Sequence, residues 1–348
     1  MNETLDVRID HVGSKGDGIV LGQDGRLFVE GALAGERALV RPLAGRDGGD
    51  RRAVLVEILE PSAERVIPPC PHAGPCGACR LQHLSLPAYG RFLEEKVKAA
   101  LHARGLDPAL VRPAALSPPA DRRRVRLAWQ REGSGTVLGT RMPRSHRIVD
   151  LATCLVARQE LMAVLPGLRR LLGRIAPASG EVALDLTEAG VDVLIIATQS
   201  PSTSDRTRIA AAFAELPSLC RIAWRSEKLR EVEVLLSRSE PIVQHGPLRL
   251  APTPGAFRQA TAHGEAAMHV FLQEHLGGAR NVVDLFGGIG SLGLSLAPLP
   301  RRLQVVEGDL AAVDTLRRAI AGGVKGCHIT ALRRDLHKEP MTARELRE

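Results

Sequence analysis

The pattern of hydrophobic and polar positions divides the chain into three parts, and the first covers residues 1–60. Short stretches with partly alternating apolar residues, such as RLFVEG and RAVLVEILE, are separated by the turn signals SKGDG, QDG and AGRDGGD. This pattern predicts five short strands and an OB-like β-barrel. A generic sandwich or hairpin domain is the alternative.

The second part, residues 61–250, mixes helical and strand periods. PAYGRFLEEKVKAALHARG, ARQELMAVLPGLRRLLGRIA and RTRIAAAFAEL predict helices, the second of them despite Pro166. RRRVRLAWQ, GTVLGTR, HRIVDL and EVALDLTEAGVDVLIIATQ predict strands. We therefore expect a central α+β domain.

In residues 251–348, buried strand patterns alternate with helical ones. A helix from about Thr261 to Leu276 precedes the strands NVVDLF, LQVVEGD and HITALRRDL, with a glycine-rich turn and helix after the first strand and the helix LAAVDTLRRAIAGG after the second. Such alternation indicates a parallel sheet of βαβ units in a Rossmann-like α/β domain. The predicted fold is thus a multidomain α+β chain.

Composition narrows the class of protein. The 348 residues are 44% hydrophobic and 25% charged, and no apolar run is long enough to cross a membrane. The start, MNETLDVRID, lacks the features of a secretory signal, so we expect a cytoplasmic protein, which we take to be a monomer. The net charge of +8 favours a polyanionic partner such as RNA, while the 3% of aromatic residues argues against an RRM-like platform.

Three of the six cysteines lie within CPHAGPCGAC. Cys70, Cys76 and Cys79 have the spacing C-x5-C-x2-C, and thiolates bind soft metals and iron–sulfur clusters. The spacing does not separate zinc from iron–sulfur, and unliganded thiols remain an alternative. The candidates for a fourth ligand are Cys154, His72 and His83.

The segment VVDLFGGIGSLGL predicts a strand that ends near Asp284 and is followed by Phe286, Gly288 and Gly290. Glycines there allow a tight turn and the close approach of a dinucleotide or S-adenosylmethionine, although they also serve packing. The next strand ends in Glu307, where a carboxylate can accept hydrogen bonds from ribose hydroxyls. A solvated strand end is the alternative for Glu307.

CPHAGPCGACRLQH, followed by the helix LEEKVKAAL, resembles the cluster motif of bacterial RNA uracil-5-methyltransferases, C-x5-C-G-[GA]-C-x2-Q. Residues 1–60 resemble the TRAM domain of that family, an OB-like RNA-binding barrel. The family's fourth ligand lies in a segment like DLATCLV. The resemblance therefore implies a 4Fe-4S cluster held by Cys70, Cys76, Cys79 and Cys154.

The glycine-rich segment resembles motif I of S-adenosylmethionine methyltransferases, which reads DLFCGIGNF in this family, with Gly287 in place of its Cys and Ser291 in place of its Asn. TPGAFRQAT resembles the family's P-x-x-F-x-Q-x-N segment, whose Gln contacts the methyl donor. The residues that the resemblance implies for binding S-adenosyl-L-methionine are Gln259, Asp284, Phe286, Gly288, Gly290, Ser291, Glu307 and Asp335.

Methylation of uracil carbon 5 requires a cysteine thiolate that adds to carbon 6 and a base that removes the carbon 5 proton. The family carries them in an S-C-N-P-like segment and a later Glu, and neither is present here. Cys220 and Cys327 fit buried strands instead. We expect an inactive, C-terminally truncated member whose methyltransferase domain is incomplete.

Basic residues of the central domain form the predicted RNA-binding face, where Trp129 would stack a base. Its residues are Arg122, Arg123, Arg124, Arg126, Trp129, Arg141, Arg144 and Arg147. The expected partner is RNA, most readily 23S ribosomal RNA, with transfer RNA as a second choice. The alternatives are a metal-stapled RNA-binding protein without catalysis and a methyltransferase for another RNA position.

Overall fold

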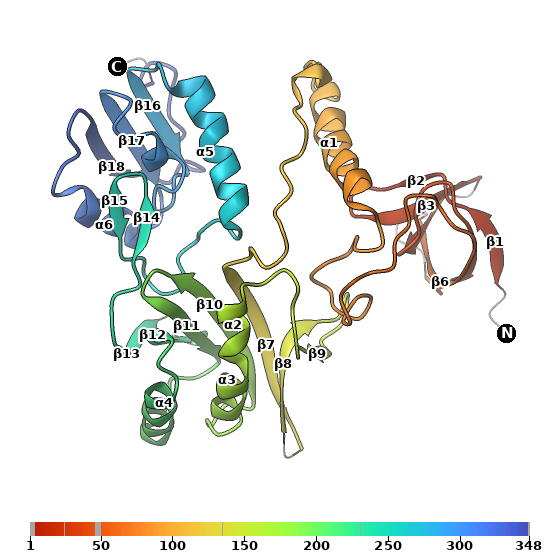
Figure 1. Ribbon diagram of the computed structural model, residues 1–348, viewed down its shortest axis with the longest axis horizontal. Coiled ribbons are helices and arrows are strands. Elements are labelled where there is room, and N and C mark those ends of the chain that lie inside the picture. Colours follow the sequence, from red (N-terminus) through yellow and green to blue (C-terminus); the bar gives the residue numbers. More distant parts are fainter. Residues whose placement is uncertain (1–3, 24, 46–49, 134, 230, 347–348) are drawn as a thin grey trace. The chain divides into compact units, whose positions relative to one another are not determined.

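The computed structural model describes residues 4–23, 25–45, 50–133, 135–229 and 231–346. The chain forms two compact units, Met1–Leu116 with Met142–Ser145, and Ser117–Arg141 with His146–Glu348 (Figure 1). The first unit thus holds both the N-terminal strands and the CPHAGPCGAC segment, and the second holds the seven-stranded sheet, the β14–β15 hairpin and the three-stranded sheet. No helix in the described ranges is long and apolar enough to cross a membrane.

The first unit contains a six-stranded sheet in the order β1-β5-β6-β4-β3-β2, in which only β4 and β6 are parallel neighbours. Its strands are β1 (Leu5–Arg8), β2 (His11–Val12), β3 (Asp17–Gly22), β4 (Gly25–Glu30), β5 (Arg37–Pro42) and β6 (Arg51–Glu60). The first predicted strand is split in two because Ile9 and Asp10 donate their N–H groups to the carbonyls of Glu36 and Ile19. The buried core is formed by Ile9, Leu27, Val29, Ala32, Ala38, Val40 and Ala53.

The CPHAGPCGAC segment follows β6 and consists of turns. The predicted helix after it is α1 (Leu86–His102), with Pro87 in its first turn, where a missing N–H costs nothing. The short 3-10 helix η1 (Pro108–Leu110) comes next.

The second unit begins with a seven-stranded sheet in the order β13-β12-β11-β10-β7-β8-β9. Its strands are β7 (Arg124–Glu132), β8 (Gly135–Arg141), β9 (Ile148–Asp150), β10 (Ser179–Thr187), β11 (Gly190–Ala197), β12 (Leu219–Ser226) and β13 (Val232–Ser237). Only β11 and β12 pair in parallel, and α4 (Thr203–Glu215) connects them. Ser202 and Asp205 form a capping box that fixes the start of this helix.

The helix predicted to run through Pro166 is instead broken into α2 (Gln159–Ala163) and α3 (Leu165–Leu172). Proline cannot donate to the preceding turn and clashes with its carbonyl, so it is accommodated in a first helical turn. Pro166 occupies that position in α3, and the uninterrupted helix was a wrong prediction.

The rest of the second unit begins with a hairpin of β14 (Val243–His245) and β15 (Leu248–Leu250), followed by α5 (Ala262–Leu276). A parallel sheet in the order β16-β17-β18 then forms, as the alternating pattern predicts. Its elements are β16 (Asn281–Leu285), η2 (Gly293–Leu296), β17 (Arg302–Glu307), α6 (Leu310–Ile320) and β18 (His328–Arg333). The first crossover contains only the 3-10 turn η2, so the α-helix predicted there was wrong. Pro298 and Pro300, just beyond η2, disfavour helix continuation.

Candidate cofactor site and nucleic-acid surfaces

The loop after β16 has an unusual backbone. Phe286, Gly288 and Gly290 all adopt left-handed conformations, with φ of 57°, 57° and 81°. Glycine adopts this region freely, but an aromatic residue there is strained, and such strain concentrates at functional sites. At Gly290 a Cβ would also lie 2.7 Å from Leu294 Cδ1, so a side chain there would push the loop away from η2.

One side of this loop is open. A Cβ built on Gly288 would meet no described atom within 4 Å, so a ligand can approach the backbone there. Phe286 is 56% exposed beside it, and its ring centroid lies 5.0 Å from that of His337. Sequence reasoning missed His337, which belongs to no motif and lies beside Phe286 only through the fold.

Glu307 ties the loop to the end of β17. One carboxylate oxygen accepts from the Gly288 N–H at 2.9 Å, and the other accepts from the N–H groups of Gly308 and Asp309 at 2.7 and 2.8 Å. A carboxylate has about four acceptor sites. Three are used, so one remains for a ligand hydroxyl, and Glu307 is more than a solvated strand end.

Asp284 closes the loop from the other side. Its Oδ2 accepts from the Gly293 N–H at 2.9 Å. Burial raises the pKa of Asp284 above its ordinary value, with the charge of Glu307 acting in the same direction and the Gly293 hydrogen bond opposing it. Asp284 therefore shapes the loop from a partly buried position.

The remaining predicted cofactor residues lie in three places. Ser291 is buried, and its carbonyl oxygen lies 2.8 Å from His269 Nε2 of α5. Gln259 is half-buried in the segment before α5. Asp335 is exposed just after β18, where it accepts the His337 N–H at 3.2 Å. Since β16, β17 and β18 are parallel, Phe286, Glu307 and Asp335 follow strand ends at the same edge of the sheet, the usual ligand side of such sheets.

The structure does not bring the predicted metal ligands together into one site. In the described ranges, no group of three or more His, Cys, Asp or Glu side chains is placed to hold a metal ion. The predicted ligands Cys70, Cys76, Cys79 and Cys154 are partly exposed. The alternative ligands His72 and His83 each have an Nε2 atom that is buried without a partner, yet neither belongs to such a group. The side chains as placed do not fit a cluster.

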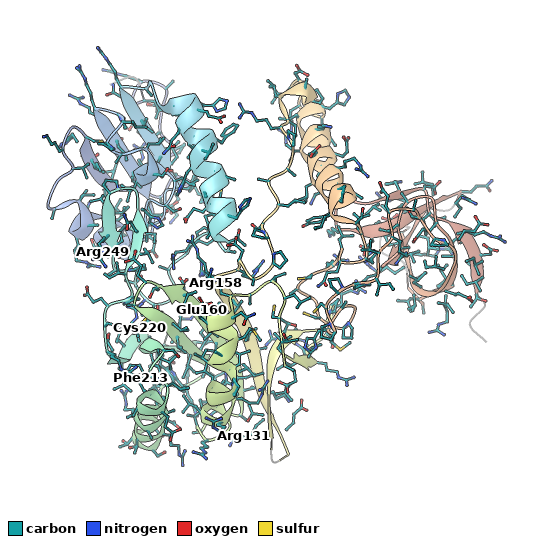
Figure 2. The ribbon with its side chains drawn as sticks, in the orientation of Figure 1. Arg131, Arg158, Glu160, Phe213, Cys220 and Arg249 are labelled. Atoms are coloured by element: carbon teal, nitrogen blue, oxygen red, sulfur yellow. The ribbon has the colours of Figure 1, made fainter. Side chains whose placement is uncertain are left out.

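Neither of the remaining cysteines is suited to nucleophilic attack. Cys220, on β12 in the central sheet (Figure 2), is 1% exposed, and Cys327 is 6% exposed. Burial raises the pKa of both thiols, which disfavours the reactive thiolate. Both are packing residues, as the sequence indicates.

The structure rearranges the predicted RNA-binding face. Trp129 is 1% exposed in the core of the central sheet, so the prediction that it stacks a base was wrong. Arg123 Nη2 donates to Glu265 Oε2 at 2.6 Å, and Arg124 Nη1 donates to the Arg258 carbonyl at 3.1 Å. Both guanidinium groups thus bind their own chain.

The other arginines of that face differ in how strongly they are paired. Arg126 and Arg141 both donate to Glu181, at 2.5 and 3.1 Å. Arg144, which belongs to the first unit, donates to Glu30 at 2.5 Å. Arg122 and Arg147 are exposed, and the side chain of Arg122 has no ion pair in the described part of the chain.

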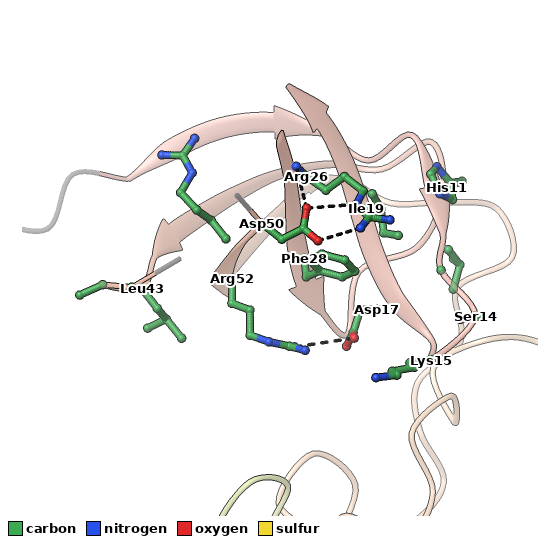
Figure 3. Close-up of a pocket in the computed structure, with 15 residues that line it drawn as sticks. His11, Ser14, Lys15, Asp17, Ile19, Arg26, Phe28, Leu43, Asp50 and Arg52 are labelled. Atoms are coloured by element: carbon green, nitrogen blue, oxygen red, sulfur yellow. Dashed lines mark hydrogen bonds and ion pairs between the residues drawn. The ribbon is translucent and has the colours of Figure 1, made fainter. Parts of the chain in front are cut away.

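The first unit carries a groove of about 750 Å³ that sequence reasoning missed (Figure 3). Its charged and aromatic lining includes His11, Lys15, Arg26, Phe28, Arg51 and Arg52. The guanidinium carbons of Arg26 and Arg52 lie 5.5 and 5.6 Å from the centre of the Phe28 ring. An aromatic ring flanked by arginines suits a nucleic-acid base and its phosphates. The sequence carries no local signal for the groove, because Phe28 and Arg52 meet only through the pairing of β4 with β6.

Comparison with known proteins decides the family. No family model matches the chain. It is 34% identical over 349 residues to an RNA methyltransferase of Brucella suis, with 99% of this chain and 80% of that protein covered. It is 35% identical over 342 residues to one of Mesorhizobium japonicum, with 97% and 78% covered. The chain belongs to this RNA methyltransferase family.

Two further proteins resemble this RNA methyltransferase. The 23S rRNA (uracil(1939)-C(5))-methyltransferase of Halomonas elongata is 34% identical over 324 residues, with 86% of this chain and 65% of that protein covered. The Pyrococcus abyssi tRNA (uracil-54, C5)-methyltransferase, solved with S-adenosyl-L-homocysteine, matches with a TM-score of 0.72 at 17% identity, over 93% of this chain and 79% of that one. The second likeness shows a shared fold. No comparison supports the predicted C-terminal truncation.

Proposed function

We propose that this RNA methyltransferase uses S-adenosyl-L-methionine to methylate carbon 5 of a uridine. The observation that carries the proposal is the open face over Gly288, bordered by the exposed Phe286 and by the one free acceptor site of Glu307. The names of the Halomonas and Pyrococcus proteins support the uracil and carbon 5 assignment. Because the Halomonas protein shares more sequence, 23S ribosomal RNA is the proposed substrate and transfer RNA the second candidate.

The cofactor would bring an electrophilic methyl group to this edge of the sheet. Glu307 would accept a ribose hydroxyl while its remaining hydrogen bonds hold the loop. Gly288 would leave room for the ligand, and Phe286 would cover one of its faces. The roles of Gln259 and Asp335 are proposed from motif resemblance.

The Gly288 assignment is tested by S-adenosyl-L-homocysteine affinity, measured by calorimetry on the Gly288→Ala variant. Gly35→Ala is the matched control, because Gly35 also has a positive φ, 80°, and no described atom within 4 Å of a built Cβ. Both variants should lose about 1 kcal/mol of folding stability. Only Gly288→Ala should weaken binding, by about tenfold or more, since its Cβ enters the ligand's space. Equal affinities for the two variants would refute the assignment.

Methyl transfer to uracil needs a thiolate, and we propose that neither Cys220 nor Cys327 supplies it. Their burial and raised pKa values support this view. We therefore expect Cys220→Ala and Cys327→Ala to leave methyl transfer unchanged. Incubation with methyl-labelled cofactor and unmodified ribosomal or transfer RNA tests this. If the unmodified chain labels uracil and either Cys327→Ala or Cys220→Ala abolishes that labelling, the proposal is wrong.

The groove around Phe28 is proposed as an RNA contact of the TRAM-like first unit. Its exposed arginines and its ring suit single-stranded RNA, in which bases are free to stack. If the chain binds RNA but no S-adenosyl-L-homocysteine, the alternative of an RNA-binding protein without catalysis replaces the enzyme proposal.

We propose a 4Fe-4S cluster on Cys70, Cys76, Cys79 and Cys154. Only the sequence motif supports this proposal, since the described side chains form no metal-holding group. Anaerobically purified protein should contain about four irons per chain and absorb broadly in the visible range. Cys154→Ser should lose the iron, whereas the buried Cys220→Ser should keep it. Colourless protein with a single zinc ion, or iron retained in Cys154→Ser, would contradict this ligand set.

A further inference from the structure

Residues 252–261, here called the strap, connect the β14–β15 hairpin to α5 and are fixed along the central sheet. Arginine side chains from that sheet bind the carbonyl oxygens of the strap. Arg221 donates to Pro252 at 2.9 Å, Arg124 to Arg258 at 3.1 Å and Arg123 to Gln259 at 3.2 Å. These side-chain hydrogen bonds hold the backbone of the strap in place, although the strap is neither a helix nor a strand.

Arg123 makes contacts in two directions. Its Nε donates to the Gln259 carbonyl, and its Nη2 donates to Glu265 Oε2 at 2.6 Å in the first turn of α5. The two side chains are only 15% and 8% exposed. The backbone N–H of Arg123 also donates to the Ala260 carbonyl at 2.9 Å. One residue therefore fixes both the end of the strap and the start of α5.

The contact continues from α5 to the glycine-rich loop. His269 lies one helical turn after Glu265, and its Nε2 is 2.8 Å from the Ser291 carbonyl oxygen. Gln273, a further turn along, donates to the Ser295 carbonyl at 3.5 Å. Thus α5 is bound by Arg123 at its first turn and, further along, contacts the Ser291 carbonyl before η2 and the Ser295 carbonyl within it.

Arg124 holds the middle of the strap. Its guanidinium carbon lies 5.5 Å from the centre of the Phe257 ring, and Nη2 donates to the Gly255 carbonyl at 3.5 Å. In the other direction, Arg258 of the strap, which is 5% exposed, donates to Asp185 Oδ1 of β10 at 2.8 Å. Arg124 thus binds two strap carbonyls, those of Gly255 and Arg258. A planar guanidinium can hold two acceptors in this way, whereas the single ammonium of lysine cannot.

We propose that Arg123 and Arg124 are positioning residues for the methyl donor, which act by fixing the strap and α5 so that Gln259 and the Ser291 loop keep the geometry that the cofactor needs. They are therefore separate from the RNA-binding surface. The inference rests on the proposed function, because it assigns the cofactor to this loop. It explains why adjacent arginines in RRRVRLAWQ have unequal surroundings: Arg122 is exposed, whereas the next two bind the strap.

The test compares Arg123→Lys and Arg124→Lys with the matched control Arg122→Lys. Three quantities are measured for each: S-adenosyl-L-homocysteine affinity by calorimetry, affinity for single-stranded RNA, and the thermal unfolding midpoint. Arg123→Lys should weaken cofactor binding about tenfold, since small misplacements of binding groups are costly. RNA affinity should change less than about twofold, because lysine keeps the charge. Arg122→Lys should change neither affinity.

The outcomes separate the inference from the function on which it rests. If the unmodified chain binds no S-adenosyl-L-homocysteine, the proposed function fails. If the unmodified chain binds it and both Lys variants bind it equally well, the positioning inference is overturned. A loss of RNA affinity with unchanged cofactor affinity would overturn it too and restore both arginines to the RNA face. If Arg123→Lys does not fold, Arg124→Lys, whose side chain is less enclosed, provides the same comparison.

Faster hydrogen exchange at the Ala266 to His269 amides of Arg123→Lys, which donate to carbonyls of the first turn of α5, without a change in the unfolding midpoint, would support local loosening of α5. Unchanged exchange there, together with weakened cofactor binding, would contradict the proposed route through the helix.

Discussion

Arginine is held in opposite ways in the groove of the first unit and at the strap of the second. In the groove, the side chains of Arg26 and Arg52 are 54% and 42% exposed and flank the Phe28 ring. At the strap, those of Arg123 and Arg258 are 15% and 5% exposed and bind carboxylates and backbone carbonyls of the same chain.

From this difference we infer that a basic segment favours an RNA surface only where its guanidinium groups remain accessible. A phosphate must compete with any acceptor that an arginine already binds, and a buried ion pair is costly to open. Arg26 can exchange its partner Asp50, which is 25% exposed, for a phosphate near solvent. Asp17, the partner of Arg52, is only 3% exposed, but Arg80 also binds it and would remain if Arg52 turned to a phosphate. Arg123 and Arg258 cannot bind a phosphate without breaking their buried ion pairs with Glu265 and Asp185.

The largest expected effect comes from breaking a strap pair. Arg258→Met would leave Asp185 in a site where burial already raises the pKa of its carboxyl. Removal of one partner from a buried pair typically costs about 3–5 kcal/mol of folding free energy. Arg26→Met in the groove should change stability little, because both Arg26 and Asp50 are accessible to solvent. Denaturant unfolding of the two variants measures the difference, and similar costs would remove the distinction between the regions.

The second effect is a pH dependence that arises from a buried histidine on the strap side. His245 is 1% exposed, and burial lowers its pKa to about 4. Glu265 acts to raise that pKa, while Arg258 and Arg123 act to lower it. Unfolded His245 would titrate near 6.5, so the unfolded state binds more protons between pH 6.5 and 4.

Stability should therefore fall with decreasing pH across that window, by up to about 3 kcal/mol from this residue, and stay constant above it. His245→Phe should remove this fall in stability at low pH, because phenylalanine keeps an aromatic ring in the core but does not titrate. Unfolding free energies of both proteins from pH 4 to pH 8 provide the measurement. Parallel curves would show that His245 is not the titrating group.

The elements that depend on local sequence could be predicted. Alternating strands and helices gave the β16-β17-β18 sheet, because period and turn signals are local properties. The positions of Gly288, Gly290 and Glu307, at or just after strand ends, were predicted for the same reason, and their role in cofactor binding stays a prediction. Their contacts, such as Glu307 with the Gly288 N–H, then follow from strands in parallel register.

The surfaces could not be predicted, because they depend on contacts between distant residues. Trp129 follows three arginines in the sequence, but strand alternation places it in the core. Arg123 meets Glu265 only after 142 residues, so its role has no local signal. Phe28 and Arg52 belong to separate strands, and their convergence in the groove comes from the sheet order.

The third prediction concerns the groove. Phe28→Ala should weaken binding of single-stranded RNA by about tenfold, because stacking of one base contributes about 1–3 kcal/mol. Phe257→Ala is the matched control, since Phe257 is 66% exposed but lies beneath Arg124 at the strap. Fluorescence anisotropy with a labelled oligonucleotide measures both. A larger loss for Phe257→Ala would reverse the assignment of the two regions.

The smallest effect is a change in salt dependence, and it separates accessible from paired arginines within one stretch of chain. Arg122 is exposed and has no ion pair in the described residues, whereas Arg126 donates to Glu181. Each phosphate contact on single-stranded RNA contributes about 0.7 to the slope of log affinity against log salt. Arg122→Gln should reduce the slope by about that amount if Arg122 binds a phosphate. Arg126→Gln should change it less, because Glu181 already neutralises that charge, and Glu181 would keep Arg141 as a partner. Equal reductions in the two variants would mean that pairing seen within the chain does not limit phosphate binding, and the contrast between groove and strap would then rest on burial alone.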